Sequence, residues 1–258
     1  MAAQDVDPDQ KAYMNDRRRE MRRLAEILSG TGIVRSIDPL DVAAKAISVG
    51  GVELDWKFEM KNLQFDLDPG AIRAQRNAKP ADLATVTLTL TVKLEGRCIG
   101  VDLPNDPFAR LSVECLETGH RRGVAAAHYS AWHLERDDPA RSGADLAHPA
   151  YHFQYGGQQI PRLVEPGNHL LLGSPRVAHP PLDGVLAVDF VISNYLPRRW
   201  SELRRNNPGY KELVGDAQRR CWRPYAFAST ARWSADDAGW DGSEVWPQVI
   251  PRDHSNAV

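Results

Sequence analysis

The longest stretch of alternating polar and apolar residues, TVTLTLTVKL at positions 85–94, limits what this chain can fold into more than any other feature. Threonine or lysine fills every second position and valine or leucine fills the others, which is the period of a β-strand with one wet and one dry face. Similar runs cover residues 52–67 and 110–115, and no helical periodicity separates them. Strands joined by short connections pair antiparallel with their neighbours, so these runs predict a meander and exclude a parallel βαβ sheet.

The first of these strands changes phase within its length. Apolar residues occupy the even positions of 52–60 and then the odd positions of 63–67. One extra residue in the strand returns the apolar side chains to a single face, so the shift predicts a β-bulge at Lys61-Asn62. Two further strands are predicted over residues 124–136 and 148–155.

Helical periodicity is found at both ends of the chain, over residues 8–28, 38–47, 182–196, 200–206 and 210–222. The dry face of a one-sided sheet must be covered, and these helices are available to cover it. The predicted fold class is therefore α+β, an antiparallel β-meander of about five strands packed against N-terminal and C-terminal helices. We expect a single domain over 1–258, with a helical segment at 1–48, the meander at 49–157, a helical segment at 158–224 and an irregular aromatic wrap at 225–258.

Composition excludes several classes of protein. The formal net charge is -2, which excludes a generally basic nucleic-acid coat protein. A mean hydropathy of -0.45 and the lack of a long apolar run predict no membrane span. The N-terminal sequence has no apolar core of a secretory signal, and three widely spaced cysteines fit a reducing compartment. We therefore expect a cytoplasmic protein without a bound cofactor.

Histidines gather in one part of the chain, and six of the eight lie between positions 120 and 169. In an extended segment over 148–155, the tyrosines and Phe153 share one face, and the other face carries His148, His152 and Gln154. The aromatic face is expected to pack against the protein. The opposite face then presents two imidazoles and an amide.

The preceding strand adds to this polar face. If a hairpin joins the two strands, His133 and Glu135 lie opposite it. The sequence thus predicts a cluster of His133, Glu135, His152 and Gln154 on the wet side of the sheet. A one-residue slip in register would send His133 to the other face.

Three interpretations of this cluster compete. Two or three imidazoles with Glu135 are suitable ligands for zinc. The spacing of these residues matches no known zinc-binding sequence motif, so we predict no metal. His133 and His152 could instead act as a general acid–base pair in phosphodiester or ester cleavage. The third interpretation, which the sequence favours, is that the histidines orient neighbouring groups or contact a ligand without catalysis.

A second candidate site is the stretch between Pro197 and Pro224, which contains eight basic residues and only three acidic ones. Arginine and aromatic side chains together bind phosphate, stack on bases and anchor protein interfaces. A solvated helical face is the plain alternative. The predicted binding residues of this stretch are Arg198, Arg199, Arg204, Arg205, Arg219, Arg220, Trp200 and Trp222.

Other polar or reactive residues are assigned to the interior. Asp189 interrupts an apolar helix, and a buried carboxylate must be paired, so we expect Arg198 or Arg199 as its partner. Cys115 and Cys221 fall on apolar faces and are predicted to be small buried hydrophobes. No nucleophile elbow, phosphate-binding loop or dinucleotide fingerprint occurs.

The pattern HPxxHFxxGG at 148–157, followed by PR at 175–176, PPLD at 180–183 and NY at 194–195, resembles a pattern in bacterial proteins. Some of those proteins are encoded among mobile or defence-type genes. The resemblance covers roughly 50 residues and implies no particular activity. It implies an association with bacterial defence systems.

The order of a helix and then a meander, with the pair His148-Pro149, is faintly similar to ubiquitin-conjugating enzymes. That family follows its His-Pro-Asn motif with a catalytic cysteine. Here Ala150 replaces the asparagine and the next cysteine is Cys221. The resemblance therefore implies a non-catalytic relative of the fold.

From the sequence we expect a non-catalytic binding or accessory protein of a bacterial system. Its contact surface would combine the histidine-bearing strand with the arginine- and tryptophan-rich helices, and the partner would be a protein or a nucleic acid. The alternative is a histidine-dependent phosphodiester hydrolase, with or without a metal.

Overall fold

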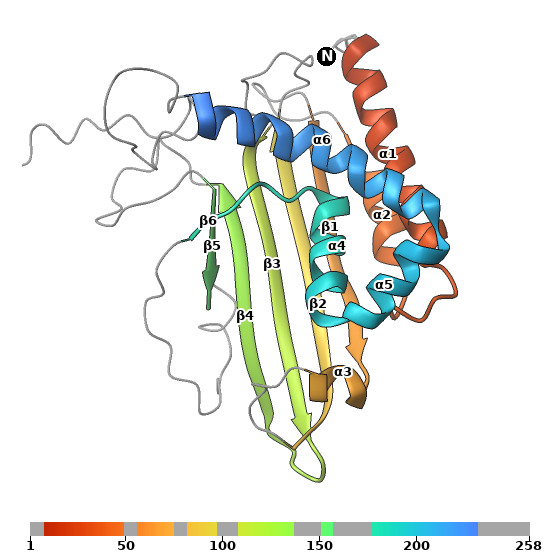
Figure 1. The fold of residues 1–258 in the computed structure, drawn as a ribbon, viewed down its shortest axis with the longest axis vertical. Coiled ribbons are helices and arrows are strands. Elements are labelled where there is room, and N and C mark those ends of the chain that lie inside the picture. Colours follow the sequence, from red (N-terminus) through yellow and green to blue (C-terminus); the bar gives the residue numbers. More distant parts are fainter. Residues whose placement is uncertain are drawn as a thin grey trace, which may run out of the picture.

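A six-stranded antiparallel sheet in the order β1-β2-β3-β4-β5-β6 lies at the centre of the fold (Figure 1). The computed structural model describes residues 8–48, 56–74, 82–96, 108–136, 151–156 and 177–231. Each strand pairs with the next along the chain, as a meander requires. The strands are β1 (Trp56–Leu67), β2 (Leu83–Gly96), β3 (Phe108–Arg121), β4 (Ala127–Arg136), β5 (Tyr151–Tyr155) and β6 (Val177–Ala178).

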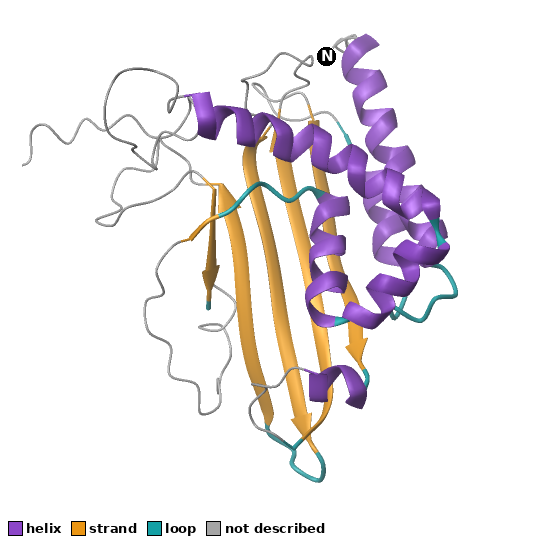
Figure 2. Ribbon diagram, viewed as in Figure 1, coloured by secondary structure: helices purple, strands orange, loops and turns teal. Residues whose placement is uncertain are grey.

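The helices lie on one face of this sheet, and α4, α5 and α6 are seen in front of the strands in Figure 2. They are α1 (Pro8–Leu28), α2 (Asp38–Ala46), α3 (Pro69–Ala74), α4 (Gly184–Tyr195), α5 (Pro197–Asn206) and α6 (Pro208–Ala231). The α+β arrangement with an antiparallel meander is thereby confirmed. No helix within the described ranges combines the length and the hydropathy that a bilayer crossing needs.

Three features differ from the sequence prediction. The six-residue helix α3 occupies part of a predicted polar loop, because the Asp68 carboxylate accepts a hydrogen bond from the Ala71 amide and starts a turn. Strand β6 is two residues long, too short to leave a periodic signal. Helix α6 runs through Pro224 to Ala231, so the predicted irregular segment does not begin at residue 225. Residues 232–258 lie outside the described ranges.

One continuous hydrophobic core joins the dry face of the sheet to both helical segments. The strands contribute side chains such as Phe65, Leu90 and Val113, all fully buried. Helix α4 is buried nearly all round, as its apolar sequence predicts. Cys115 and Cys221 are buried in this core, as predicted.

The predicted bulge lies where the change of phase placed it. The β1–β2 register shifts between Met60 and Leu63, and Asn62 adopts the left-handed conformation with a φ of 56°. Asparagine tolerates this conformation better than other side chains with a Cβ. The bulge returns Leu63 and Phe65 to the buried face that Met60 already occupies.

Asn62 therefore fixes the register of the first strand, and its replacement by valine should be destabilising. We expect Asn62→Val to lower the free energy of unfolding by about 1–2 kcal/mol, because a β-branched residue is strained at positive φ. The matched variant Asn62→Gly should stay within about 0.5 kcal/mol of the wild type. Urea unfolding followed by circular dichroism measures both. If both variants lost the same free energy of unfolding, backbone strain at residue 62 would not be the cause of the destabilisation.

Candidate functional site

The predicted histidine–glutamate cluster forms on strands β4 and β5. The register pairs His133 with Gln154 and Glu135 with His152, and the Leu134–Phe153 pair lies between these two rows of the ladder. Side chains alternate along a strand, which puts all four on one face of the sheet. The structure therefore brings together the residues that the hairpin argument predicted. His148 lies outside the described residues.

The geometry of the cluster is compact. One ligand atom each from His133, Glu135 and His152 lie within 4.8 Å of one another. The Nε2 atom of His133 is 3.9 Å from Oε2 of Glu135. The two imidazole rings stand nearly perpendicular, at 83°, with their centroids 6.1 Å apart. Three polar groups thus converge on one point from two neighbouring strands.

The cluster is more buried than a wet face implies. His133 is 8% exposed and His152 is 2% exposed, whereas the Glu135 side chain keeps 35% of its surface in contact with solvent. Nδ1 of His133 is buried and has no hydrogen-bond partner among the described residues. Buried polar atoms are nearly always paired, so an orphaned imidazole nitrogen needs an explanation.

The opposite face of the same strands is aromatic and holds them against α4. The Trp132 ring stacks on Phe153 with centroids 5.1 Å apart and meets Phe190 of α4 edge-on at 5.2 Å. The Trp132 indole donates a hydrogen bond to the Tyr195 hydroxyl at 2.9 Å, and that hydroxyl donates to Glu117. Burial, and then the Glu117 charge, raise the pKa of Tyr195 well above its ordinary value. This packing gives the polar cluster a rigid support.

His179, just after β6, lies on the aromatic side and is not part of the cluster. Its ring contacts Phe153 and Phe190. Nδ1–H donates to the Pro180 carbonyl at 2.6 Å. Burial lowers the pKa of His179, which keeps the ring neutral near pH 7. The backbone N–H of His179 also bonds to the Tyr151 carbonyl, which continues the β5–β6 pairing.

Of the arginine-rich surface that the sequence predicts, helix α5 is the part that the structure presents to solvent. Arg198, Arg199 and Arg205 are exposed and form no ion pair with the described residues. The Arg204 guanidinium lies over the Trp200 ring, 4.8 Å from its centroid. Within its ten residues α5 carries four arginines and one glutamate. The positive charge of this helix is therefore open to solvent.

Helix α5 also borders a groove. With α3 it encloses a volume of about 260 Å³, and Arg198 and Arg199 line one side. Asp68 and Glu202 line it as well, so the groove combines both signs of charge. Residues from α3, which the sequence did not predict as a helix, thus border the same groove as the arginines of α5.

Asp189 does not pair with Arg198 or Arg199, contrary to prediction. Its Oδ1 atom accepts hydrogen bonds from the Trp200 indole and the Tyr210 hydroxyl, each at 2.8 Å. Two neutral donors stabilise the buried carboxylate, and this frees the arginines to face solvent. Burial, and then Asp189, raise the pKa of Tyr210 well above its ordinary value. Trp200 is accordingly a structural anchor as well as a stacking partner of Arg204.

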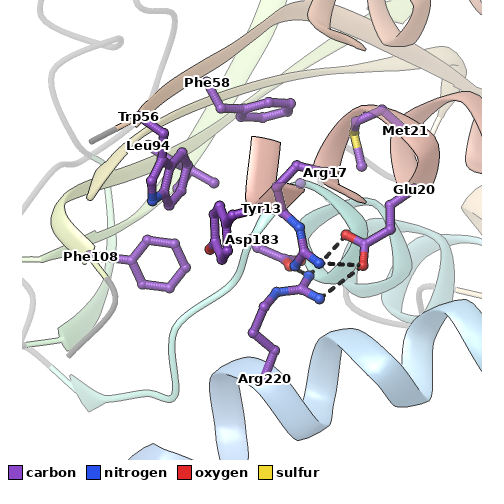
Figure 3. A pocket seen from close by; sticks show the side chains of 11 residues that line it. Tyr13, Arg17, Glu20, Met21, Trp56, Phe58, Leu94, Phe108, Asp183 and Arg220 are labelled. Carbon is purple, nitrogen blue, oxygen red and sulfur yellow. Dashed lines mark hydrogen bonds and ion pairs between the residues drawn. The ribbon is translucent and has the colours of Figure 1, made fainter. Parts of the chain in front are cut away.

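Arg220 was predicted to bind a partner, but it belongs to the interior (Figure 3). Its guanidinium bonds to Glu20 of α1 at 2.9 Å and to the Asp183 carboxylate before α4. Burial lowers the pKa of Arg220, but the charges of Asp183 and Glu20 outweigh it and hold the pKa above the usual value. Trp222 is half-buried and donates to the Pro181 carbonyl. Arg219, by contrast, is exposed and pairs only with Asp216.

Asp183 and Glu20 are key residues that sequence reasoning missed. Asp183 is the N-cap of α4, and its Oδ1 accepts from the Leu186 amide at 2.9 Å. The signal available was an aspartate immediately before an apolar helix. The pairing of Glu20 with a residue 200 positions away leaves no local signature.

A small cavity lies beside Arg220, Glu20 and Asp183. Its volume is about 20 Å³, which is room for one water molecule.

Comparisons of the chain with protein-family models, with curated proteins and with solved structures found no match in any of the three. The two resemblances drawn from sequence patterns therefore stay predictions.

Arg219 and Arg220 of α6 are neighbours in the sequence and allow a matched test of the ion pairs that Arg220 forms with Glu20 and Asp183. We expect Arg220→Met to lower the free energy of unfolding by about 3–5 kcal/mol, because it leaves the Asp183 carboxylate buried without its cation and Glu20 with Arg17 alone. Arg219→Met, which removes an exposed ion pair, should cost less than about 1 kcal/mol. Chemical unfolding of the two variants measures the difference. Similar costs at the two positions would refute the structural role of Arg220.

Proposed function

We propose that the protein is a non-catalytic binding protein, an accessory component of a bacterial system, and that helix α5 contacts the phosphates of a nucleic acid. The observation that carries the proposal is the uncompensated charge of α5, with three exposed arginines that form no ion pair with the described residues. Guanidinium groups bind phosphate oxygens in pairs, and an arginine held over a tryptophan keeps a fixed direction.

The near-neutral net charge of the whole chain supports a local contact and not a general coating of nucleic acid. The groove beside Arg198 and Arg199 is of a size to admit a phosphate group and part of its sugar. An acidic segment of a partner protein would present carboxylates to the same arginines, and the experiment below separates the two. We propose a cytoplasmic location, and a role in antiviral defence rests on the sequence resemblance.

The α5 proposal predicts a specific loss on charge removal. Arg198→Gln combined with Arg199→Gln should weaken binding to a labelled single-stranded oligonucleotide by at least tenfold, because two phosphate contacts are lost. The slope of log K against log salt should fall by about 1.4, since each contact with a single strand contributes about 0.7. Fluorescence anisotropy over a range of salt concentrations measures both quantities.

The matched control is Arg110→Gln with Arg121→Gln. It removes the same two charges from exposed ion pairs on the sheet, far along the chain from α5. Binding by this variant should stay within about twofold of the wild type, and its salt slope should not change. If the wild type binds no oligonucleotide, or if both variants lose affinity equally, α5 is not a nucleic-acid contact. Binding of an acidic peptide alone would assign the arginines to a partner protein.

A histidine-dependent phosphodiester hydrolase is the second candidate, favoured by the convergence of His133, Glu135 and His152. In such a reaction one neutral imidazole takes a proton from the attacking water. The other, protonated, gives a proton to the leaving oxygen as its bond to phosphorus breaks. The partly exposed Glu135 could orient either ring.

The hydrolase candidate predicts turnover of a chromogenic nitrophenyl phosphodiester by the wild-type protein. His133→Gln should lower the rate by about 100-fold or more, the usual contribution of a general acid or base. His120→Gln, at an exposed position of β3, is the matched control and should keep the full rate. A wild-type protein without turnover removes the candidate, and so does a His133→Gln variant with unchanged turnover.

A further inference from the structure

We propose that His133, Glu135 and His152 bind one divalent transition-metal ion of the first row, Zn²⁺ being the representative. This inference is independent of the α5 contact and does not require that the protein be an enzyme. It also departs from the sequence prediction, which expected no metal. The reason for the departure is geometric, because the sequence alone gave neither the register nor the burial of the three residues.

The donor set selects the class of ion. Two imidazoles and one carboxylate suit zinc and its first-row neighbours, whereas magnesium and calcium are bound through oxygen atoms. Three protein ligands leave one position of a tetrahedral ion for water or for a second molecule. The side chain of Glu135, which is 35% exposed, leaves this position a route to solvent.

The distances between the donor atoms fit a tetrahedral metal site after a small adjustment. Ligands about 2.1 Å from a tetrahedral ion lie roughly 3.4 Å from one another. The His133 and Glu135 atoms are 3.9 Å apart and no pair in the group exceeds 4.8 Å. The widest pair must therefore close by at most about 1.4 Å. Rotation of the partly exposed Glu135 side chain can supply this, while the ladder of β4 and β5 holds the backbone in place.

The unpaired imidazole supports a ligand role. Nδ1 of His133 has no partner among the described residues, and Nε2 is beyond hydrogen-bond distance from Glu135. A buried donor or acceptor without a partner destabilises the folded state, and a metal bond to Nδ1 would remove that cost. A metal bond to Nε2 would instead fix the proton on Nδ1. The partly buried groups Arg220 and Asp189 have partners for their charges. Nδ1 of His133 has none among the described residues.

The surroundings of the cluster are also polar. Glu114 on β3 is the register neighbour of His133 on one side, and Gln154 on β5 is its neighbour on the other. Imidazole ligands commonly depend on such groups for their orientation and basicity. Two neutral imidazoles and one carboxylate leave a bound divalent ion with one net positive charge, which Glu114 is placed to offset.

The test uses the full-length protein after dialysis against a chelator. Isothermal titration with Zn²⁺, and with Co²⁺ whose visible absorption reports its coordination, should each show one saturable site per chain. Glu135→Gln should weaken Zn²⁺ binding by at least tenfold, and His133→Gln should weaken it further. Zn²⁺ should raise the unfolding temperature of the wild type and leave that of Glu135→Gln nearly unchanged.

Glu95→Gln is the matched control. Glu95 lies on the same face of the sheet, on β2, and its side chain is 33% exposed compared with 35% for Glu135. This variant should bind Zn²⁺ as the wild type does, and circular dichroism should show that all variants fold. The absence of a saturable site in the wild type would overturn the proposal. Unchanged affinity in Glu135→Gln, or an equal loss in Glu95→Gln, would also overturn it.

Discussion

The alternation of side chains along β4 determines the rest of the candidate site. Trp132 and Leu134 are fully buried against the helices, and Trp132 is held by contacts to Phe190 and Tyr195 of α4. His133, between them, must then point to the opposite face. A slip of one residue would bury the imidazole among aromatic rings and move the tryptophan to the face of the polar cluster, away from Phe190 and Tyr195. The energy that places the polar cluster is therefore hydrophobic.

The position of α4 depends in turn on the buried ion cluster at its N-terminus. Asp183 caps the helix through one carboxylate oxygen and binds Arg220 through the other. Arg220 also binds Glu20, so the same guanidinium joins α1, α4 and α6. The same helix carries Phe190, whose ring contacts Trp132 on the strand that presents His133. Helices α1 and α6, which are far apart in the sequence, thus meet at the N-terminus of α4, the helix that packs against the strand of the candidate site.

Periodicity predicted the parts of this arrangement that are local. The five main strands, the bulge at Asn62 and the shared face of His133 and His152 all follow from alternation of residues two apart. It failed where partners are distant in the chain. Arg220 looks like its neighbour Arg219 in sequence, yet one is enclosed by carboxylates and the other faces solvent. Likewise the donors to Asp189 are a tryptophan and a tyrosine, which no count of charges would select.

Hydrogen-bond satisfaction separates the structural polar groups from the candidate functional ones. Asp189 and Asp183 lie inside the fold and each has at least two donors. Arg17 also has buried nitrogens without a partner, but its guanidinium binds Glu20 and lies over the Tyr13 ring. Its charge is therefore balanced. His133 has no such compensation, although it is more buried than Arg17 and stands 3.9 Å from a partly exposed carboxylate. Among the described residues, His133 is therefore the side chain with an unpaired buried atom and no balancing ion pair, and this distinguishes it from the structural polar groups.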